Sequence, residues 1–187
     1  MRTPKPTKAD LARSRGRAHA IGSALGLVPR SDPEFPTHWH VEGEYGGRKV
    51  HITIGCPRFA RGLFRSACID FMVVRIEGPT WLPEGAEARP ARRTVGDWRE
   101  GAPGEAGNVA TAAGASYVLL PAELVPALGQ RVADAVDRLP HAGWVHATST
   151  DLELRPADLE EGDDAAQIAK AVLDWDGFRA SEEPACP

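Results

Sequence analysis

Two alternating segments joined by a pair of glycines constrain the fold of this chain more than any other feature. Residues 37–45 and 48–54 each alternate in side-chain character, which is the pattern of a half-buried strand. Gly46 and Gly47 between them favour a two-residue type I′ turn, because both central positions of that turn need a positive φ. The sequence therefore predicts an antiparallel hairpin over these residues.

The predicted turn also fixes which residues lie opposite each other. The expected cross-strand pairs are Tyr45 with Arg48, Glu42 with His51, and His40 with Thr53. Because successive side chains of a strand point to opposite sides, the hairpin has one apolar and one polar side. The apolar side, which we expect to face the core, carries Trp39, Val41, Tyr45, Val50, Ile52 and Ile54. The polar side carries His38, His40, Glu42, Glu44, Lys49, His51 and Thr53.

Apolar periodicity and helix-breaking residues predict the other elements. A helix is expected over 8–27, where apolar and small residues recur at helical spacing before two prolines end the pattern. The remaining predicted elements are a strand at 68–76, a short buried strand at 116–120, a helix at 121–139, a hairpin of 143–149 with 151–155, and a helix at 163–178.

Residues 77–115 are rich in glycine and proline and keep no sustained period. Such a stretch predicts a long loop, either mobile or functional, or one that hides a short strand pair near 92–98. The length of 187 residues suits one core better than two. We therefore expect a single domain over 8–180 that contains this loop, with disordered tails at 1–7 and 181–187.

The predicted order of elements is α-β-β-β-(loop)-β-α-β-β-α. It indicates an α+β fold: a mostly antiparallel sheet of about five to six strands with helices packed on one face. This order is similar to that of small secretion-chaperone-like and YbjN-like bacterial proteins. The resemblance implies an acidic, dimeric protein that binds partners. A free face or edge of the sheet is where a partner or a second copy of the chain would bind.

Composition and charge narrow the cellular compartment in which we expect the protein. Lys and Arg number 22 against 26 Asp and Glu, for a net charge of −4, and no apolar run approaches the roughly 18 residues of a membrane helix. The N-terminal residues lack the apolar segment of a secretory signal. Cys56, Cys68 and Cys186 form no C-x-x-C pair, which favours a reducing compartment. We expect a cytoplasmic protein, of bacterial origin by its Ala, Arg, Gly and Pro bias, without a membrane partner.

The polar side of the predicted hairpin carries the strongest candidate for chemistry. It places His38, His40 and His51 on one side of the sheet, with Glu42 opposite His51. Imidazole and carboxylate groups are ligands for zinc, iron or nickel, so a divalent metal site at the three histidines is one hypothesis. The other interpretation is a polar strand surface with no cofactor. We favour the second, because ligand spacing alone gives many false matches.

A second candidate lies in the loop at 57–65, where basic and aromatic residues alternate. Arginine and aromatic side chains are enriched at protein interfaces, and they also stack on bases and contact phosphates. The acidic net charge disfavours the nucleic-acid alternative. The partner-binding residues that we predict here are Arg58, Phe59, Arg61, Phe64 and Arg65.

The basic N-terminal segment has two possible interpretations. Arg13, Arg15 and Arg17 would contact phosphates in a nucleic-acid-associated protein, or form the solvated face of the first helix. We favour the solvated face, because runs of one charge usually mark such surfaces.

The function expected from the sequence is non-catalytic. No phosphate-binding loop, dinucleotide fingerprint, nucleophile elbow or H-E-x-x-H motif is present. We therefore expect an adaptor or chaperone-like module that binds a protein partner. A metal-dependent enzyme built on the hairpin histidines is the first alternative, and a nucleic-acid-associated protein is the second.

Overall fold

The computed structural model describes most of the chain. The described residues are 7–55, 58–61, 65–68, 70–90, 107–110, 116–138, 143–148, 150–156, 159, 162–175 and 177–178. Three α-helices are α1 (Lys8–Leu25), α2 (Val125–Val136) and α3 (Ala165–Asp174), and a short 3₁₀ turn η1 (Ala122–Leu124) precedes α2. The strands are β1 (Val28–Ser31), β2 (Trp39–Tyr45), β3 (Arg48–Gly55), β4 (Arg58–Arg61), β5 (Arg65–Cys68), β6 (Phe71–Glu77), β7 (Glu87–Pro90), β8 (Asn108–Ala110), β9 (Ser116–Leu120), β10 (Trp144–Ala147) and β11 (Asp151–Arg155).

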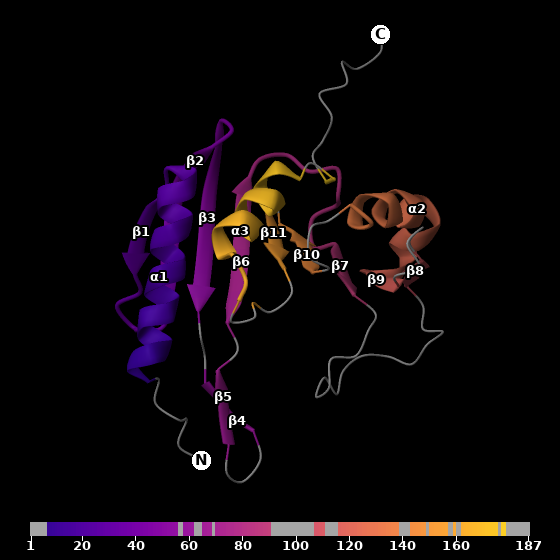
Figure 1. Ribbon diagram of the computed structural model, residues 1–187. Helices are drawn as coiled ribbons and strands as arrows, with labels where there is room; N and C mark the ends of the chain where they lie inside the picture. Colours follow the sequence, from indigo (N-terminus) through magenta and orange to yellow (C-terminus); the bar gives the residue numbers. More distant parts are fainter. Residues whose placement is uncertain are drawn as a thin grey trace.

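Nine of these strands form one sheet in the order β1-β2-β3-β6-β11-β10-β7-β9-β8 (Figure 1). Every pairing in it is antiparallel. The α+β class is therefore confirmed, whereas the expected five to six strands are too few. The strands that were not predicted, β1, β7 and β8, have only three or four residues, and so short a segment shows no readable alternation.

The hairpin predicted at the glycine pair is present in the predicted register. Gly46 and Gly47 have φ of 59° and 75°, as a type I′ turn requires. The pairs Tyr45–Arg48, Glu42–His51 and His40–Thr53 all lie opposite each other.

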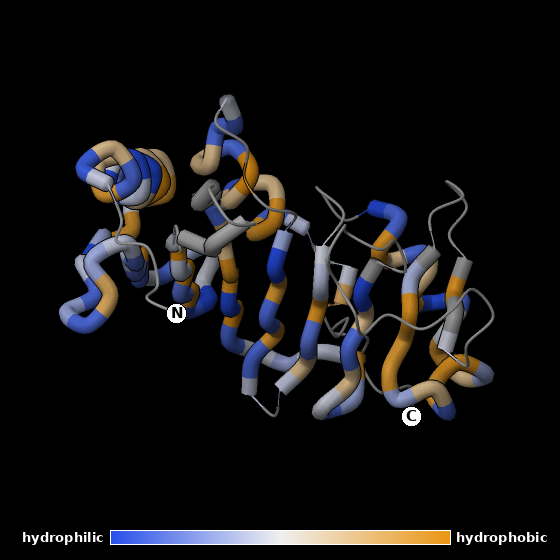
Figure 2. The backbone as a smooth tube through the Cα atoms, turned by 90° about the horizontal axis from the view of Figure 1, so that it is seen from below, coloured by the Kyte–Doolittle hydropathy of each residue, from blue (hydrophilic) through white to orange (hydrophobic). Residues whose placement is uncertain are grey.

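The strand registers align one row of buried side chains across the sheet. Each member of the row is directly opposite the next on the neighbouring strand, and none is more than 1 % exposed: Val41, Ile52, Val74, Leu154, Val145, Ala88 and Leu119. Polar residues alternate with apolar ones along these strands (Figure 2). The sheet therefore has one continuous core face.

The helices pack on that core face. Helix α1 lies over β1 and β2 and against α3, which lies over β6, while α2 packs on β8 and β9 at the far end of the sheet (Figure 1). The apolar side of α3 and of the segment after it is buried, at Ile168, Val172, Trp175 and Phe178. No helix in the described ranges is both long and apolar enough to span a membrane.

A buried ion cluster joins α1 to the sheet. Arg13 Nε donates to an Asp70 carboxylate oxygen at 2.7 Å, and the Arg17 guanidinium pairs with the same carboxylate. Arg17 and Asp70 are 8 % and 5 % exposed, so the predicted solvated arginine face was wrong at Arg17. Arg17 faces the sheet because its guanidinium pairs there with Asp70, which immediately precedes β6. Arg15 is exposed.

The predicted long loop at 77–115 is interrupted by regular structure. Strands β7 and β8 both lie within it and join the main sheet. The suggested strand pair near 92–98 falls outside the described residues. The predicted loop at 57–65 likewise contains β4 and the first residue of β5, and these two strands pair with each other as a separate two-stranded sheet.

We predict that the turn glycines and a helix glycine respond oppositely to alanine. An added Cβ meets no atom within 4 Å at either Gly47 or Gly16, so backbone conformation alone separates them. Gly47→Ala should lower the free energy of unfolding by about 1–2 kcal/mol, because φ is positive there. Gly16→Ala should raise it by about 0.5–1 kcal/mol, because it lies inside α1. Urea denaturation of both variants measures this, and a loss of stability in Gly16→Ala would contradict it.

We predict that Asp70→Asn lowers the free energy of unfolding by about 3–5 kcal/mol, because it leaves the buried Arg17 charge without its carboxylate. The matched control is Glu153→Gln, which breaks the Arg75 ion pair at the surface and should cost about 0–1 kcal/mol. Thermal and urea unfolding compare the two. Equal losses would show that the Asp70 cluster contributes no more than a surface pair.

Candidate functional site

The side of the sheet opposite the core face, which we call the open face, is polar. Directly opposed residues on successive strands form a row of titratable side chains across it: Glu42, His51, Arg75, Glu153, His146 and Glu87. Two pairs of neighbours in the row are in contact, His51 with Glu42 and Arg75 with Glu153. Arg75 Nε lies 3.0 Å from a Glu153 carboxylate oxygen, and His146 stacks on Trp144 with ring centroids 5.4 Å apart. The open face is therefore lined with titratable and hydrogen-bonding groups.

A hydrogen-bonded chain of side chains lies at the β2–β3 end of the open face. We call it the histidine network: Asp32, His40, Thr53, His51 and Glu42. His40 Nδ1 and His51 Nε2 are 3.1 Å apart, and the Thr53 hydroxyl lies 3.1 Å from His51 Nε2 and 3.3 Å from His40 Nδ1. The outer ring nitrogens contact carboxylates: His40 Nε2 is 3.0 Å from Asp32, and His51 Nδ1 is 3.1 Å from Glu42.

Local structure orients both ends of the network. Asp32 follows β1 and accepts the backbone N–H groups of Glu34 and Phe35 at 2.7 and 2.9 Å, which fixes its carboxylate beside His40. Hydrogen bonds from Phe35, His40 and Glu34 hold the pKa of Asp32 below its usual value, so it is an anion at neutral pH. Burial lowers the pKa of His51, which favours the neutral imidazole.

The structure separates His38 from the other two histidines of the predicted metal site. His38 is on the same side of β2, but its ring stacks on Phe35 and meets the edge of Phe71, with centroids 5.2 and 5.4 Å away. Burial lowers its pKa. Across the described ranges, no three His, Cys, Asp or Glu side chains converge on a common metal position. The three-histidine site stays a prediction, and only His40 and His51 are in direct contact.

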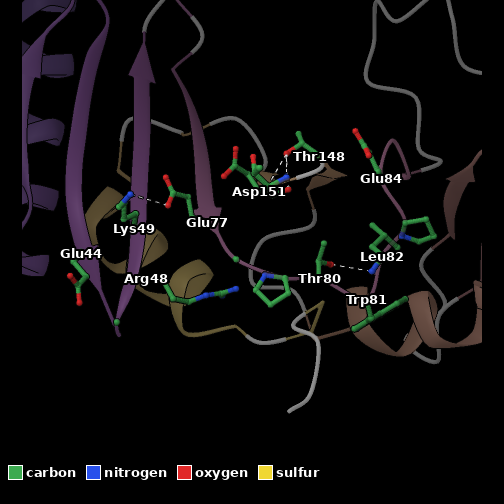
Figure 3. A pocket seen from close by; sticks show the side chains of 15 residues that line it. Glu44, Arg48, Lys49, Glu77, Thr80, Trp81, Leu82, Glu84, Thr148 and Asp151 are labelled. Atoms are coloured by element: carbon green, nitrogen blue, oxygen red, sulfur yellow. Dashed lines mark hydrogen bonds and ion pairs between the residues drawn. The ribbon is translucent and has the colours of Figure 1, made fainter. Parts of the chain in front are cut away.

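The open face is hollowed where β6 ends and where β3 and β11 begin. A hollow of about 1270 Å³, which we call the strand-end hollow, has charged side chains of β2, β3, β6 and β11 on one wall (Figure 3). Proline, tryptophan and leucine form the other wall, together with Glu84. A smaller hollow of about 440 Å³ joins it to the histidine network, because Lys49, Glu77 and Asp151 line both and Glu42 and His51 line the second. The two hollows form one continuous groove.

Two like charges face each other in the strand-end hollow. Asp151 on β11 is directly opposite Glu77 on β6, an arrangement that destabilises an antiparallel pair. Lys49 Nζ lies 3.5 Å from Glu77, as the dashed line in Figure 3 marks. Within the described part of the chain Asp151 has no ion pair, although its backbone is held by Thr148. The hollow therefore retains uncompensated negative charge.

Gly177, Phe178 and helix α2 hold the apolar wall of the hollow in place. The Trp81 indole N–H donates to the Gly177 carbonyl at 3.0 Å, and Thr80 donates to the Phe178 carbonyl at 2.7 Å. The Arg131 guanidinium from α2 lies 4.1 Å from the centroid of the Trp81 ring. These contacts fix the Trp81 ring before any ligand arrives.

The partner-binding residues predicted at 57–65 are placed only in part. Arg58, Phe59 and Arg61 lie on β4 and Arg65 lies on β5, and these two strands pair away from the main sheet (Figure 1). Phe64 lies outside the described residues, and the side chains of the other four are not described. Their role in binding a partner stays a prediction.

Sequence reasoning missed several residues of the open face. Asp32 carried a local signal, since an aspartate before a proline often begins a turn, but nothing in the sequence joined it to His40. Arg75, Glu77 and Asp151 reach the site through pairings between β3, β6 and β11, which are distant in sequence. Their alternation within each strand was the only available signal.

Comparison with known proteins finds no relative of this chain. The chain matches no protein-family model, no curated protein and no solved structure. No residue role is therefore transferred from another protein. The geometry of the histidine network and of the strand-end hollow is what we use to infer function.

Proposed function

We propose that the protein is a binding module whose strand-end hollow takes a basic segment of a partner protein. The observation that carries this proposal is the pair of opposed carboxylates, Glu77 and Asp151, at the centre of the hollow. Opposed like charges cost stability, and a cationic side chain placed between them would remove that cost. The chain supplies Lys49 to Glu77, which leaves Asp151 for a cation from outside.

The chemistry of the two walls supports a lysine or arginine side chain as the occupant. Glu44, Glu77, Glu84 and Asp151 give the hollow more carboxylates than the basic groups of Arg48 and Lys49 can balance. The opposite wall offers Trp81 and prolines to the aliphatic part of the same side chain. Lysine and arginine bury their stems on apolar surface in this manner while their charged ends meet carboxylates.

The size of the groove favours a chain segment over a small molecule. Small-molecule pockets commonly measure about 300–1,000 Å³ and enclose their ligand. The strand-end hollow is larger, at about 1270 Å³, and it continues into the second hollow along the open face. An extended peptide that carries spaced basic residues fits this shape.

We predict that Asp151→Asn binds basic peptides more weakly while the folded domain becomes slightly more stable. The substitution removes one of two opposed charges, which should raise the free energy of unfolding by about 0.2–1 kcal/mol. The probe is an array of lysine- and arginine-containing peptides, with the same peptides carrying alanine at the basic positions as the reference. Binding to wild type should weaken as salt rises.

The matched control is Glu123→Gln, which removes an exposed carboxylate on η1, away from the hollow. It should leave peptide binding unchanged. If wild type binds basic and alanine-substituted peptides equally, or if both variants reduce binding alike, the strand-end hollow is not the site.

A further inference from the structure

The side chains of the histidine network carry fewer N–H and O–H hydrogens than their contacts with one another require. Carboxylates accept hydrogen bonds and donate none when ionised, so the ring nitrogens that face Asp32 and Glu42 must carry hydrogens. A neutral imidazole has only one N–H. When both imidazoles are neutral, these contacts place the hydrogen of His40 on Nε2 and that of His51 on Nδ1. The two remaining nitrogens, His40 Nδ1 and His51 Nε2, then face each other as lone pairs at 3.1 Å.

Thr53 does not remove the shortage. Its hydroxyl lies within hydrogen-bond distance of both inner nitrogens, but it has one hydrogen and can donate to only one of them. Three atoms with lone pairs thus form a triangle that contains a single hydrogen. Such a triangle is stable when a cation sits among the three donor atoms.

The dimensions of the triangle match a tetrahedral metal ion. Donors bound at about 2.0–2.1 Å to one tetrahedral ion lie roughly 3.3 Å from each other. The three separations here are 3.1, 3.1 and 3.3 Å. The structure thus presents three donors as one face of a coordination tetrahedron, with the fourth position left for water or another ligand.

The outer contacts have the arrangement that supports a metal ion. Ligating histidines commonly donate their other ring N–H to a carboxylate, which orients the ring and raises the basicity of the ligand nitrogen. Asp32 and Glu42 do this for His40 and His51. Their two negative charges match the charge of a divalent cation. The nearby Arg75 is paired with Glu153 at 3.0 Å, which offsets its repulsion.

We propose that His40 Nδ1, His51 Nε2 and the Thr53 hydroxyl form a binding site for a divalent transition-metal ion of the zinc class. Imidazole ligands favour zinc, copper and nickel over magnesium and calcium. This set differs from the three histidines that the sequence suggested, because His38 contacts aromatic rings instead. The site does not depend on the peptide-binding function proposed above.

We predict that the wild-type chain binds one Zn²⁺ ion and does not bind Mg²⁺ at the same site. Calorimetric titration with each metal salt measures this. The double variant His40→Ala/His51→Ala should lose the Zn²⁺ site. Asp32→Asn should weaken Zn²⁺ binding by about 10-fold, since it removes an outer carboxylate partner. His146→Ala is the control, because it removes a histidine from the same face without touching the network, and binding should persist.

Nitrogen-detected NMR of the histidine rings tests the same proposal in wild type, without any variant. The metal-free protein should show the hydrogens on His40 Nε2 and His51 Nδ1, and Zn²⁺ should shift the resonances of His40 Nδ1 and His51 Nε2. Three outcomes would overturn the proposal. They are Zn²⁺ binding that survives the double variant, Zn²⁺ binding that is lost in His38→Ala, and a pair that shares a proton and takes up no Zn²⁺.

Discussion

The register of the β2–β3 hairpin is the constraint on which the rest of the molecule depends. Gly46 and Gly47 adopt positive φ, and their turn decides which of two sets of side chains enters the core. A slip of one residue would exchange the two sets. The buried row that starts at Val41 and the histidine network on the opposite side are therefore two results of the same turn. Core and candidate site cannot vary independently here.

Helix α1 is held to this sheet by an ion cluster as well as by apolar packing. It is capped by Thr7 and Asp10 and approaches β1 closely at Gly22, where an added Cβ would lie 2.8 Å from the Leu27 carbonyl oxygen. Small residues allow the close approach but bury little apolar area. The Asp70 carboxylate, which pairs with Arg13 and Arg17, supplies a specific attachment in its place. That attachment also places β6, which carries Arg75 and Glu77 to the open face.

The parts of the fold that could be predicted are those fixed by local rules. The hairpin turn, its register, the α2 and α3 stripes and β9 all follow from period and turn chemistry within a few residues. The short strands β1, β7 and β8 could not be predicted, because their pairing depends on partners elsewhere in the chain. The same holds at the site. The placement of His40 and His51 on one side of the sheet followed from the hairpin, whereas the positions of Asp32 and Asp151 beside them needed tertiary structure.

The open face carries two arrangements of side chains that are locally unfavourable. A positive charge would stabilise either of them. Glu77 and Asp151 oppose each other across two strands, and the ring nitrogens His40 Nδ1 and His51 Nε2 lie 3.1 Å apart. Natural sequences usually satisfy such groups internally, and exceptions concentrate at functional positions. On our proposals, positive charge would relieve each exception: a basic side chain in the hollow and a metal ion at the network. The two sites share the groove between Lys49 and His51, so a cation bound at one lowers the negative potential felt at the other.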